Sequence, residues 1–270
     1  MALTDRVAVV VGASGGIGAA TVRALLARRT RVAVAALGDA LLEALVAETA
    51  AYGDRVLVVP TDITRRDDVD ALVARTLEAF GRIDVLVNAA GIGSSPSFSD
   101  SSDEEIERVL AVNLLGAART MHAVIPVMRA QRSGTIVNIG SIAGESGVMG
   151  VYSASKFGLR GLNDSIRREL RSEGISVTLI QPGFVATPMN AAMENLPPPE
   201  IIADAIVRAI DRPRRKTIVP WNYRPAVWAA KAFPGAIDLI FGDARIQRRL
   251  NRDARAARAA AEATPANEPV

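Results

Sequence analysis

Tyr152 and Lys156 stand four positions apart in the stretch VYSASKFGLRG. On a helix this spacing places both side chains on one face, one turn apart. A phenol has a pKa of about 10, so it is a poor acid or base at neutral pH unless a nearby cation favours its anion. Lysine supplies such a cation, and the pair could then move a proton to or from a reacting oxygen. A surface tyrosine beside a salt-bridging lysine would have the same spacing, so the pair needs support from the rest of the chain.

A glycine-rich segment near the N-terminus points to a second kind of chemistry. Residues 7–11 form an unbroken apolar run, which is typical of a buried parallel strand. The run leads directly into Gly12, Gly16 and Gly18, and an amphipathic helical pattern follows. This order can bind a phosphate, because a helix N-terminus offers unpaired N–H groups and glycines permit close approach. The spacing matches neither the strict GxGxxG fingerprint nor a P-loop, and a tight turn without a ligand is the alternative.

Alternating patterns indicate the elements that must position these residues. Apolar runs typical of strands occupy residues 7–11, 31–36, 55–60, 83–87, 134–140, 175–181 and 217–220. Helical patterns lie between them, at residues 39–51, 65–80, 103–130, 152–173 and 199–211. The alternation predicts a single α/β domain whose parallel sheet carries helices on both faces, and right-handed crossovers make it doubly wound. Ligands of such folds bind at the carboxyl ends of the strands.

Polar and glycine-rich loops follow several of the predicted strands. The sequence Asn-Ala-Ala-Gly follows the fourth strand at residues 88–91, and Ser-Ile-Ala-Gly follows the fifth at residues 141–144. The sixth strand leads into Pro-Gly-Phe-Val-Ala-Thr at residues 182–187. Each loop alone is generic. We expect them to meet the first glycine turn in one crevice, because all four follow parallel strands.

The order of these motifs resembles the classical short-chain dehydrogenase/reductase family over about residues 5–190. VGASGGIG is similar to the family's TGxxxGIG, with Val11 in place of threonine, and residues 88–91 are similar to its NNAG, with Ala89 for the second asparagine. VNIGSIAG resembles the serine segment, with Gly140 before the serine, while YSASK and QPGFVAT match two further motifs. The resemblance implies a Rossmann-type, seven-stranded doubly wound sheet.

The resemblance also implies four catalytic positions, Asn113, Ser141, Tyr152 and Lys156. During reduction, hydride moves from the nicotinamide to a carbonyl carbon, and the developing alkoxide needs a proton and hydrogen-bond donors. Tyr152 would donate the proton and Ser141 would hold the oxygen. Lys156 would lower the pKa of Tyr152 and bind the nicotinamide ribose. Asn113, in AVNLLG, would anchor a water that feeds protons through Lys156; polar packing within a helix is the alternative.

The implied cofactor is NAD or NADP. The residues expected to bind it are Gly12, Ser14, Gly16, Ile17, Gly18, Asp62, Ile63, Asn88, Ala90, Tyr152, Lys156, Pro182, Val185 and Thr187. Asp62 would bond the adenine amine, cap the helix expected near residue 65, or do both.

A carboxylate after the second strand would select NAD, and a basic residue would favour NADP. This chain has Ala36, Leu37 and Gly38 there, and Ser14 and Gly15 in the glycine loop, so neither selector is present.

Composition excludes several other classes of function. The 270 residues are 49% hydrophobic, which suits one domain with a substantial core. The chain has no cysteine, and His122 is its only histidine, so neither a zinc site nor a Ser-His-Asp triad is expected. Packing within a helix is the expected role of His122. We expect no signal peptide and no run of the roughly 18 apolar residues that span a bilayer, hence a cytoplasmic protein. A homo-oligomer, either a dimer or a tetramer, is also expected.

The C-terminal part differs in composition from the rest. We expect a dinucleotide-binding and catalytic domain over residues 1–220, an apolar and basic extension over 221–260, and a disordered tail over 261–270. The extension holds both tryptophans, Trp221 and Trp228, and an arginine-rich stretch follows them. Such a segment suits a membrane interface or the rim of a lipophilic-substrate site. An oligomer contact followed by a solvated helix is the alternative. No nucleic-acid role is expected, because no reading motif accompanies the arginines.

Two classes of function fit this pattern. The first is an NAD(P)-dependent oxidoreductase that interconverts an apolar ketone or aldehyde and an alcohol, with Tyr152 as general acid and base. The second is a catalytically silent dinucleotide-binding regulator on the same fold. Such regulators typically lose the Tyr/Lys pair, and this chain keeps all four implied catalytic positions, which favours the enzyme.

Overall fold

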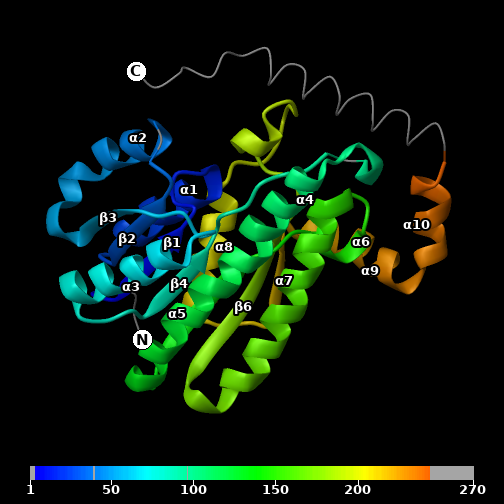
Figure 1. Ribbon diagram of the computed structural model, residues 1–270. Coiled ribbons are helices and arrows are strands. Elements are labelled where there is room, and N and C mark those ends of the chain that lie inside the picture. Colours follow the sequence, from blue (N-terminus) through cyan, green and yellow to red (C-terminus); the bar gives the residue numbers. More distant parts are fainter. Residues whose placement is uncertain (1–3, 39, 96, 244–270) are drawn as a thin grey trace.

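Seven parallel strands form the centre of the molecule, in the order β3-β2-β1-β4-β5-β6-β7 (Figure 1). The computed structural model describes residues 4–38, 40–95 and 97–243. The strands are β1 (Val7–Val11), β2 (Arg31–Ala36), β3 (Val56–Pro60), β4 (Val85–Asn88), β5 (Gly134–Ile139), β6 (Ile175–Pro182) and β7 (Lys216–Val219). The order reverses between β1 and β4, so this is the doubly wound sheet that the sequence predicts.

Helices cover both faces of the sheet. The longer ones are α1 (Gly16–Leu26), α2 (Ala40–Thr49), α3 (Arg66–Phe80), α4 (Asp103–Leu110), α5 (Ala117–Gln131), α7 (Gly150–Glu169) and α8 (Glu200–Asp211). Leu25 of α1 and Ile206 of α8 belong to the core on one face. Leu72 of α3, Met121 of α5 and Leu159 of α7 belong to the core on the other. The layers match the expected α/β domain with helices on both faces.

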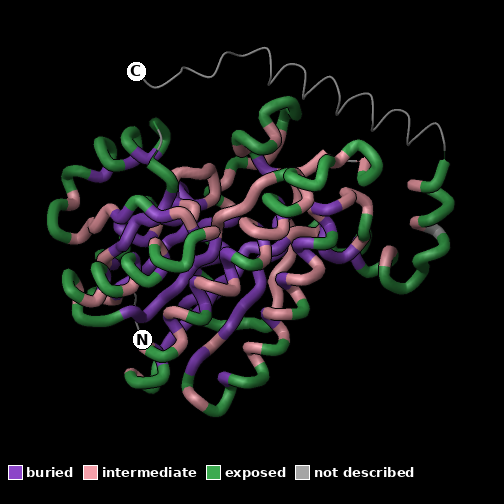
Figure 2. The backbone as a smooth tube through the Cα atoms, in the orientation of Figure 1, coloured by how far each residue is buried: buried purple, intermediate pink, exposed green. Residues whose placement is uncertain are grey.

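The central strands are apolar on both faces because each face meets a helix layer. In β1, Ala8 and Val10 belong to one core, whereas Val9 and Val11 belong to the other. All five residues of β1 are buried, and Figure 2 shows buried backbone throughout the middle of the sheet with exposed helix surfaces outside. A continuous apolar run is therefore the correct signature of a strand here.

The helix predicted over residues 103–130 is interrupted in the structure. Between α4 and α5, residues Ala111–Gly116 form a π-helical turn. Asn113 in this turn aims its amide at the backbone of Ile92. Gly116 packs so closely on Ile63 that an added Cβ would stand 2.5 Å from the Ile63 Cδ1 atom. The apolar pattern runs through the turn unbroken, so it gives no sign of the interruption, although single π turns often mark functional sites.

Residues 103–131 also form the one described stretch that is long and apolar enough to cross a membrane. The expectation that no run reaches this length was therefore wrong for this stretch. Length and composition are weak signs, because core helices pass the same test. Val109, Met121, Val124 and Met128 of the stretch are buried inside the fold, so the helices belong to the layer that covers the sheet.

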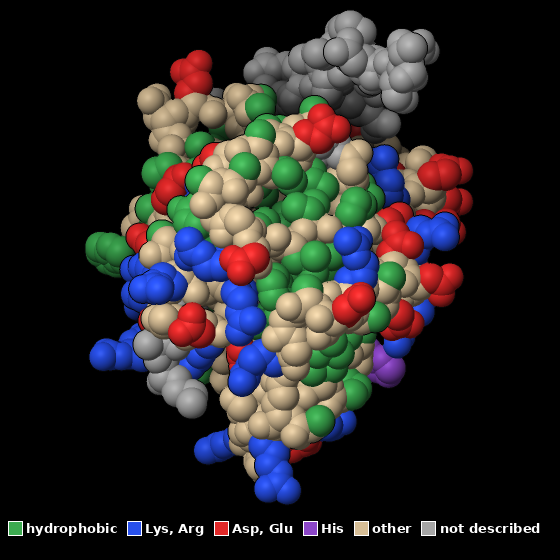
Figure 3. Space-filling view, turned by 90° about the vertical axis from the view of Figure 1, so that its left-hand side faces the viewer, with side chains coloured by type: hydrophobic (Ala, Val, Ile, Leu, Met, Phe, Trp, Pro, Cys, Tyr) green, Lys and Arg blue, Asp and Glu red, His purple; other side chains and the backbone are tan. Residues whose placement is uncertain are grey.

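Surface charges of both signs lie together on the side of the molecule that carries α2 and α3. Figure 3 shows Lys and Arg side chains among Asp and Glu side chains on this face. Arg66 pairs with Asp70 within α3, and its guanidinium lies 3.1 Å from the Nδ1 atom of His122 on α5. His122 is exposed, so the packing role expected for it was wrong.

The chain continues beyond β7 into two short helices at the outer edge of the fold. They are α9 (Arg224–Ala232) and α10 (Pro234–Phe241). Figure 1 shows α9 beside the short α6 (Ala143–Ser146) and α10 further out. Lys231 of α9 forms an ion pair with Glu145 of α6. The expected extension thus begins as an ordered part of the fold. Its remainder, including the arginine-rich stretch and the tail over 261–270, lies outside the described residues.

Candidate active site

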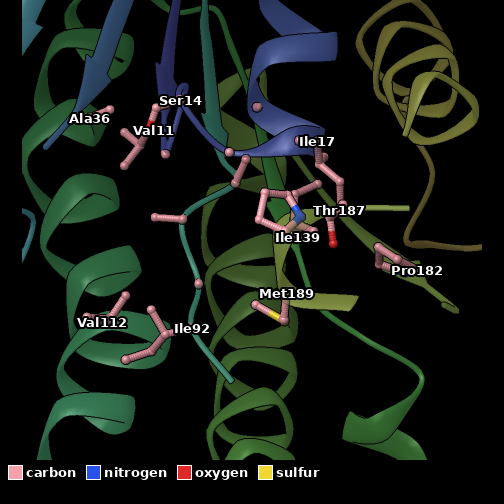
Figure 4. A pocket seen from close by; sticks show the side chains of 18 of the residues that line it. Val11, Ser14, Ile17, Ala36, Ile92, Val112, Ile139, Pro182, Thr187 and Met189 are labelled. Carbon is pink, nitrogen blue, oxygen red and sulfur yellow. The ribbon is translucent and has the colours of Figure 1, made fainter. Parts of the chain in front are cut away.

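A cavity of about 480 Å³ opens at the carboxyl ends of the strands. The segments that follow β1, β4, β5 and β6 line it, as predicted from their positions in the chain. Figure 4 shows these strand ends converging on the cavity, with Ile92, Ile139 and Met189 around it. The predicted residues that line it are Gly12, Ser14, Gly16, Ile17, Gly18, Asp62, Ile63, Ala90, Ser141, Tyr152, Lys156, Pro182, Val185 and Thr187.

The glycine turn after β1 leaves room for a ligand at the N-terminus of α1. Gly12 has a φ of +73°, and a side chain there would overlap the backbone of Ala90. A side chain at Gly18 would overlap the carbonyl of Gly12, and a Cβ at Gly16 would stand 2.9 Å from the Cγ2 atom of Thr187. Gly15 at the N-cap provides no side chain to satisfy the first N–H groups of α1. The turn is therefore a cradle for an anionic group such as a pyrophosphate.

Tyr152, Ser141 and Lys156 meet on the side of the cavity formed by the end of β5 and by α7. Tyr152 and Ser141 share a side-chain hydrogen bond, and the Ser141 Oγ atom also accepts from the backbone N–H of Ala143 at 3.1 Å. The Nζ atom of Lys156 lies 5.6 Å from the centre of the Tyr152 ring. Both side chains come from the first two turns of α7, so the helical spacing brings them to one face as expected.

Burial is the main cause of the pKa shifts of Tyr152 and Lys156. It raises the pKa of Tyr152, and the hydrogen bond with Ser141 lowers it by less. Burial also lowers the pKa of Lys156 to about 8. The expectation that Lys156 depresses the Tyr152 pKa therefore does not hold for the cofactor-free protein. Removal from water outweighs attraction between the two groups here.

Asn113 lies beneath the cavity beside this group. Its Oδ1 atom accepts from the Ile92 N–H at 2.8 Å, and its Nδ2 atom donates to the Ile92 carbonyl at 2.9 Å and to the Ser155 Oγ atom at 3.1 Å. A Cβ at Gly91 would stand 3.2 Å from the Lys156 Nζ atom and 3.3 Å from the Asn113 Oδ1 atom. Asn113 thus holds the loop after β4 beside Lys156, and the water-anchoring role stays a prediction.

Asn88 differs from the prediction that it contacts the cofactor. It is buried below the cavity and does not line it. Its Oδ1 atom accepts from the Thr120 hydroxyl at 2.7 Å, and its Nδ2 atom donates to the Asn138 Oδ1 atom at 2.9 Å. Asn138 in turn donates to Asn163 at 3.0 Å. Because the Asn88 amide is satisfied inside the protein, its role is to join β4, α5 and β5.

The side of the cavity next to β2 and β3 suits an adenosine group. It does not select between a free ribose 2′-hydroxyl and a 2′-phosphate. Asp62 lines it, and its Oδ1 atom accepts from the N–H of Thr64 at 2.8 Å and from the Thr64 hydroxyl at 2.7 Å. It therefore closes a turn before α3, whose N-cap residue is Arg65. Ala36, Leu37 and Leu41 line the neighbouring wall, so no charged side chain from this wall would meet a ribose 2′ position.

Sequence reasoning missed several residues of the site. Ile92, Val112, Ile139, Gly140 and Met189 line the cavity, and the Ser94 hydroxyl accepts from the backbone N–H of Tyr152 at 3.2 Å. Ile92 directly follows the recognised loop at residues 88–91, and Met189 follows the segment at 182–187. Extending each motif by a few residues would have found them.

The arrangement fits a nicotinamide dinucleotide. The glycine cradle and the start of α1 would hold the pyrophosphate, and Asp62 and Ile63 would lie at the adenine. Tyr152 and Lys156 would hold the nicotinamide ribose, with Pro182, Val185 and Thr187 along the ring. The fit rests on the cradle. Glycines at positions 12 and 18 allow the tight packing of this turn, and Gly15 leaves the first N–H groups of α1 without a side-chain cap.

Comparison with known proteins places this architecture in a family. The family model described as short chain dehydrogenase matches residues 6–196. The chain belongs to the short-chain dehydrogenase family. The resemblance of the motifs is thereby confirmed, and this short-chain dehydrogenase is an NAD(P)-dependent oxidoreductase.

Relatives and solved structures agree with this membership. An uncharacterized oxidoreductase of Staphylococcus haemolyticus is 35% identical over 229 residues, which cover 83% of this chain and 98% of the relative. A 3-oxoacyl-[acyl-carrier-protein] reductase of Synechocystis sp. is 42% identical over 198 residues, covering 72% of this chain and 79% of the relative.

Two crystal structures resemble the whole fold. A short-chain dehydrogenase/reductase from Burkholderia phymatum in complex with NAD has a TM-score of 0.80 and 25% identity, covering 87% of this chain and 96% of that one. A variant of actinorhodin polyketide ketoreductase with NADPH has a TM-score of 0.75 and 29% identity, covering 81% of this chain and 97% of that one. The short-chain dehydrogenase described here accordingly uses NAD or NADP.

Proposed function

We propose that this short-chain dehydrogenase interconverts an apolar ketone or aldehyde and the corresponding alcohol, with Tyr152 as general acid and base. The observation that carries the proposal is the convergence of Tyr152, Ser141 and Lys156 on one side of the cavity. The names of two similar proteins, a 3-oxoacyl reductase and a polyketide ketoreductase, also refer to substrates with a keto group. The regulator alternative would not need this convergence.

Each side chain has a defined task in the reduction. A nicotinamide held in the cavity would supply a hydride for the carbonyl carbon. Tyr152 donates its phenolic proton to the carbonyl oxygen, which becomes the alcohol hydroxyl. The raised pKa of Tyr152 keeps this proton available at neutral pH. Ser141 donates a hydrogen bond to the same oxygen and stabilises the developing negative charge. In the reverse direction, Tyr152 must first lose its proton to act as the base.

Lys156 supports both the cofactor and the proton transfer. Its Nζ atom donates to the carbonyl oxygen of Ile139 at 3.0 Å, which fixes the ammonium group near the Tyr152 ring. From there it would donate to the ribose hydroxyls and favour the tyrosinate formed when the proton leaves. Lys156→Ala is expected to weaken dinucleotide binding and to lower kcat together.

The apolar cavity wall beside Tyr152 favours an apolar substrate. Ile92, Val112, Ile139 and Met189 line the cavity there (Figure 4), and Met189 is half-exposed at its edge. A hydrocarbon chain would bury its surface against these side chains, at about 25 cal/mol per Å² of apolar area. A charged substrate would find no described basic side chain among the residues lining the cavity apart from Lys156.

A substrate panel followed by absorbance at 340 nm tests the proposal. Ketones, aldehydes and secondary alcohols of increasing chain length are assayed with NADH, NADPH, NAD and NADP in parallel. We expect turnover that improves with chain length and disappears in Tyr152→Phe. Binding of dinucleotide without turnover of any carbonyl compound would favour the regulator instead.

We further propose a peripheral membrane contact through the C-terminal helices. Trp221, Trp228, Phe233, Leu239 and Ile240 are exposed on or beside α9 and α10, and aromatic side chains favour the membrane interface. Arginines of the following stretch would add attraction to anionic lipid, weakening with salt. Cosedimentation with anionic vesicles should fall when residues 243–270 are deleted and when salt is raised. Absence of cosedimentation at low salt would contradict the membrane contact. It would favour an oligomer contact or the rim of a substrate site.

A cytoplasmic location and a homo-oligomer, either dimer or tetramer, complete the proposal. Light scattering of the purified chain measures the oligomer size, and a monomeric mass would contradict that part. Cell fractionation tests the location, with the enzyme expected in the cytoplasm or at the inner face of its membrane.

A further inference from the structure

Glu145 is a buried carboxylate that three cations share. Its side chain is 0% exposed, and its oxygens pair with Arg160 at 2.8 Å, with Lys216 at 3.0 Å and with Lys231. The Nε2 atom of Gln181 donates to its Oε1 atom at 2.7 Å. Glu145 does not line the cavity and has no part in the proton transfer. A group with this many partners outside the reacting atoms calls for a separate explanation.

The partners of Glu145 come from separate parts of the chain. Arg160 belongs to α7, Gln181 to β6, Lys216 to β7 and Lys231 to α9. Burial would raise the pKa of Glu145, but hydrogen bonds from Lys231, Gln181 and Lys216 outweigh it and hold the pKa below its usual value. The carboxylate therefore stays charged at neutral pH. Removing one partner of a buried charge is costly, so the cluster holds these elements as a unit.

Backbone contacts join this cluster to the segments that carry the catalytic residues. The Gln181 amide that binds Glu145 also donates to the backbone carbonyl of Ser141 at 3.3 Å. A Cβ at Gly144 would stand 2.9 Å from the carbonyl carbon of Lys156, so α6 lies directly on α7 at that residue. Arg160, one turn after Lys156, donates to the Gly144 carbonyl at 3.1 Å as well as to Glu145. The cluster thus fixes the Ser141 loop against the helix that carries Tyr152 and Lys156.

The C-terminal segment reaches the same side of the cavity at a second point. The Tyr223 ring lies so close to Gly183 that any side chain at position 183 would overlap it. Gly183 lines the cavity after β6. Residues 221–232 therefore support the Ser141 loop through Lys231 and the loop after β6 through Tyr223. This contact does not extend to the glycine cradle or the adenosine wall.

We propose that Glu145 is a positioning residue for the reaction, and that α9 holds the Ser141 loop in its reactive geometry through Lys231. The inference rests on the proposed reductase function for its kinetic consequence only. Its structural consequence, the immobilisation of residues 141–147 by α9, can be measured without any substrate.

Lys231 offers the cleaner test, because its side chain is 43% exposed and its replacement leaves Glu145 two other cations. Lys231→Met should lower kcat about tenfold, since small displacements of reacting groups are costly. The dissociation constant of the dinucleotide should stay within about twofold, because the cradle is remote from α9. Lys231→Arg should restore most of the loss. Arg66→Met, which breaks the exposed pair with Asp70, is the matched control and should leave kcat unchanged.

Hydrogen exchange of the cofactor-free protein gives the independent readout. Lys231→Met should speed exchange over residues 141–147, whereas Lys231→Arg and Arg66→Met should not. Faster exchange with a lower kcat supports the inference, and an unchanged kcat or unchanged exchange overturns it. If the wild-type chain turns over no carbonyl compound, the proposed function fails, and exchange alone then decides whether α9 holds the loop.

Discussion

Lys156 points its ammonium nitrogen toward Tyr152 from 5.6 Å, measured to the centre of the phenol ring. The two side chains are a turn apart on α7, and both lose most of their contact with water. Burial raises the pKa of Tyr152 and lowers that of Lys156 to about 8. In the cofactor-free protein, each group therefore favours its neutral form more than it would in water. The phenol therefore stays protonated at neutral pH, and the lysine titrates at a pKa of about 8.

The low pKa of Lys156 predicts a pH dependence of stability. Its pKa falls from 10.5 to about 8 on folding, so the folded state disfavours the ammonium form. The penalty is complete below pH 8 and is relieved as pH rises from about 8 towards 10.5, because the unfolded chain then binds the extra proton. Lys156→Met should therefore stabilise the cofactor-free protein at pH 7 and remove this rise. Urea unfolding of the wild type and of Lys156→Met at pH 7 and pH 9.5 measures these differences in stability. A Lys156→Met protein less stable than wild type at pH 7 would contradict the assignment.

Gly91 packs closely against the side chains of both Lys156 and Asn113. A Cβ there would stand 3.2 Å from the Lys156 Nζ atom and 3.3 Å from the Asn113 Oδ1 atom. Gly91→Ala should displace the lysine by a few tenths of an ångström and lower kcat about tenfold. Gly161→Ala is the control. Gly161 lies on the same helix as Lys156, and its added Cβ would have nothing within 4 Å. Equal kcat values for the two variants would argue against the role of this contact.

Asn88 should matter for stability more than for cofactor binding. Asn88→Ala leaves the Asn138 Oδ1 atom without its donor in the core, whereas the Thr120 hydroxyl keeps its bond to the Ala117 carbonyl. Unsatisfied buried groups cost about 1–3 kcal/mol each, so the free energy of unfolding should fall by at least that amount. Dinucleotide affinity, measured by fluorescence titration of the folded variant, should change only a few-fold. A large loss of affinity at unchanged stability would restore the direct contact predicted from the sequence.

Strands and site loops could be predicted from the sequence because local patterns determine them. The run at residues 7–11 is apolar throughout because β1 is covered on both faces, and the Tyr152 and Lys156 spacing needs only one helix to bring the side chains together. The π turn at Ala111–Gly116 could not be predicted, since no local pattern marks it and its Asn113 bonds to Ile92, 21 residues earlier.

Contacts between distant residues explain the other differences. Asn88 lies inside a recognised motif, but its partner Asn138 is 50 residues away, and nothing local tells a buried amide from one facing a ligand. Glu145 directly follows the Ser-Ile-Ala-Gly segment, and its partner Lys216 lies 71 residues further on. The pKa of Tyr152 could not be anticipated either, because it depends on burial that the assembled cavity imposes.

Tyr152→Phe tests whether Tyr152 donates the proton in carbonyl reduction. The variant keeps the ring and loses only the hydroxyl that bonds Ser141. Reduction of the best substrate is followed at 340 nm, with dinucleotide affinity measured separately by fluorescence. We expect affinity within a few-fold of wild type and a kcat lower by at least ~10², the low end expected for loss of a general acid. A kcat close to that of wild type would contradict it.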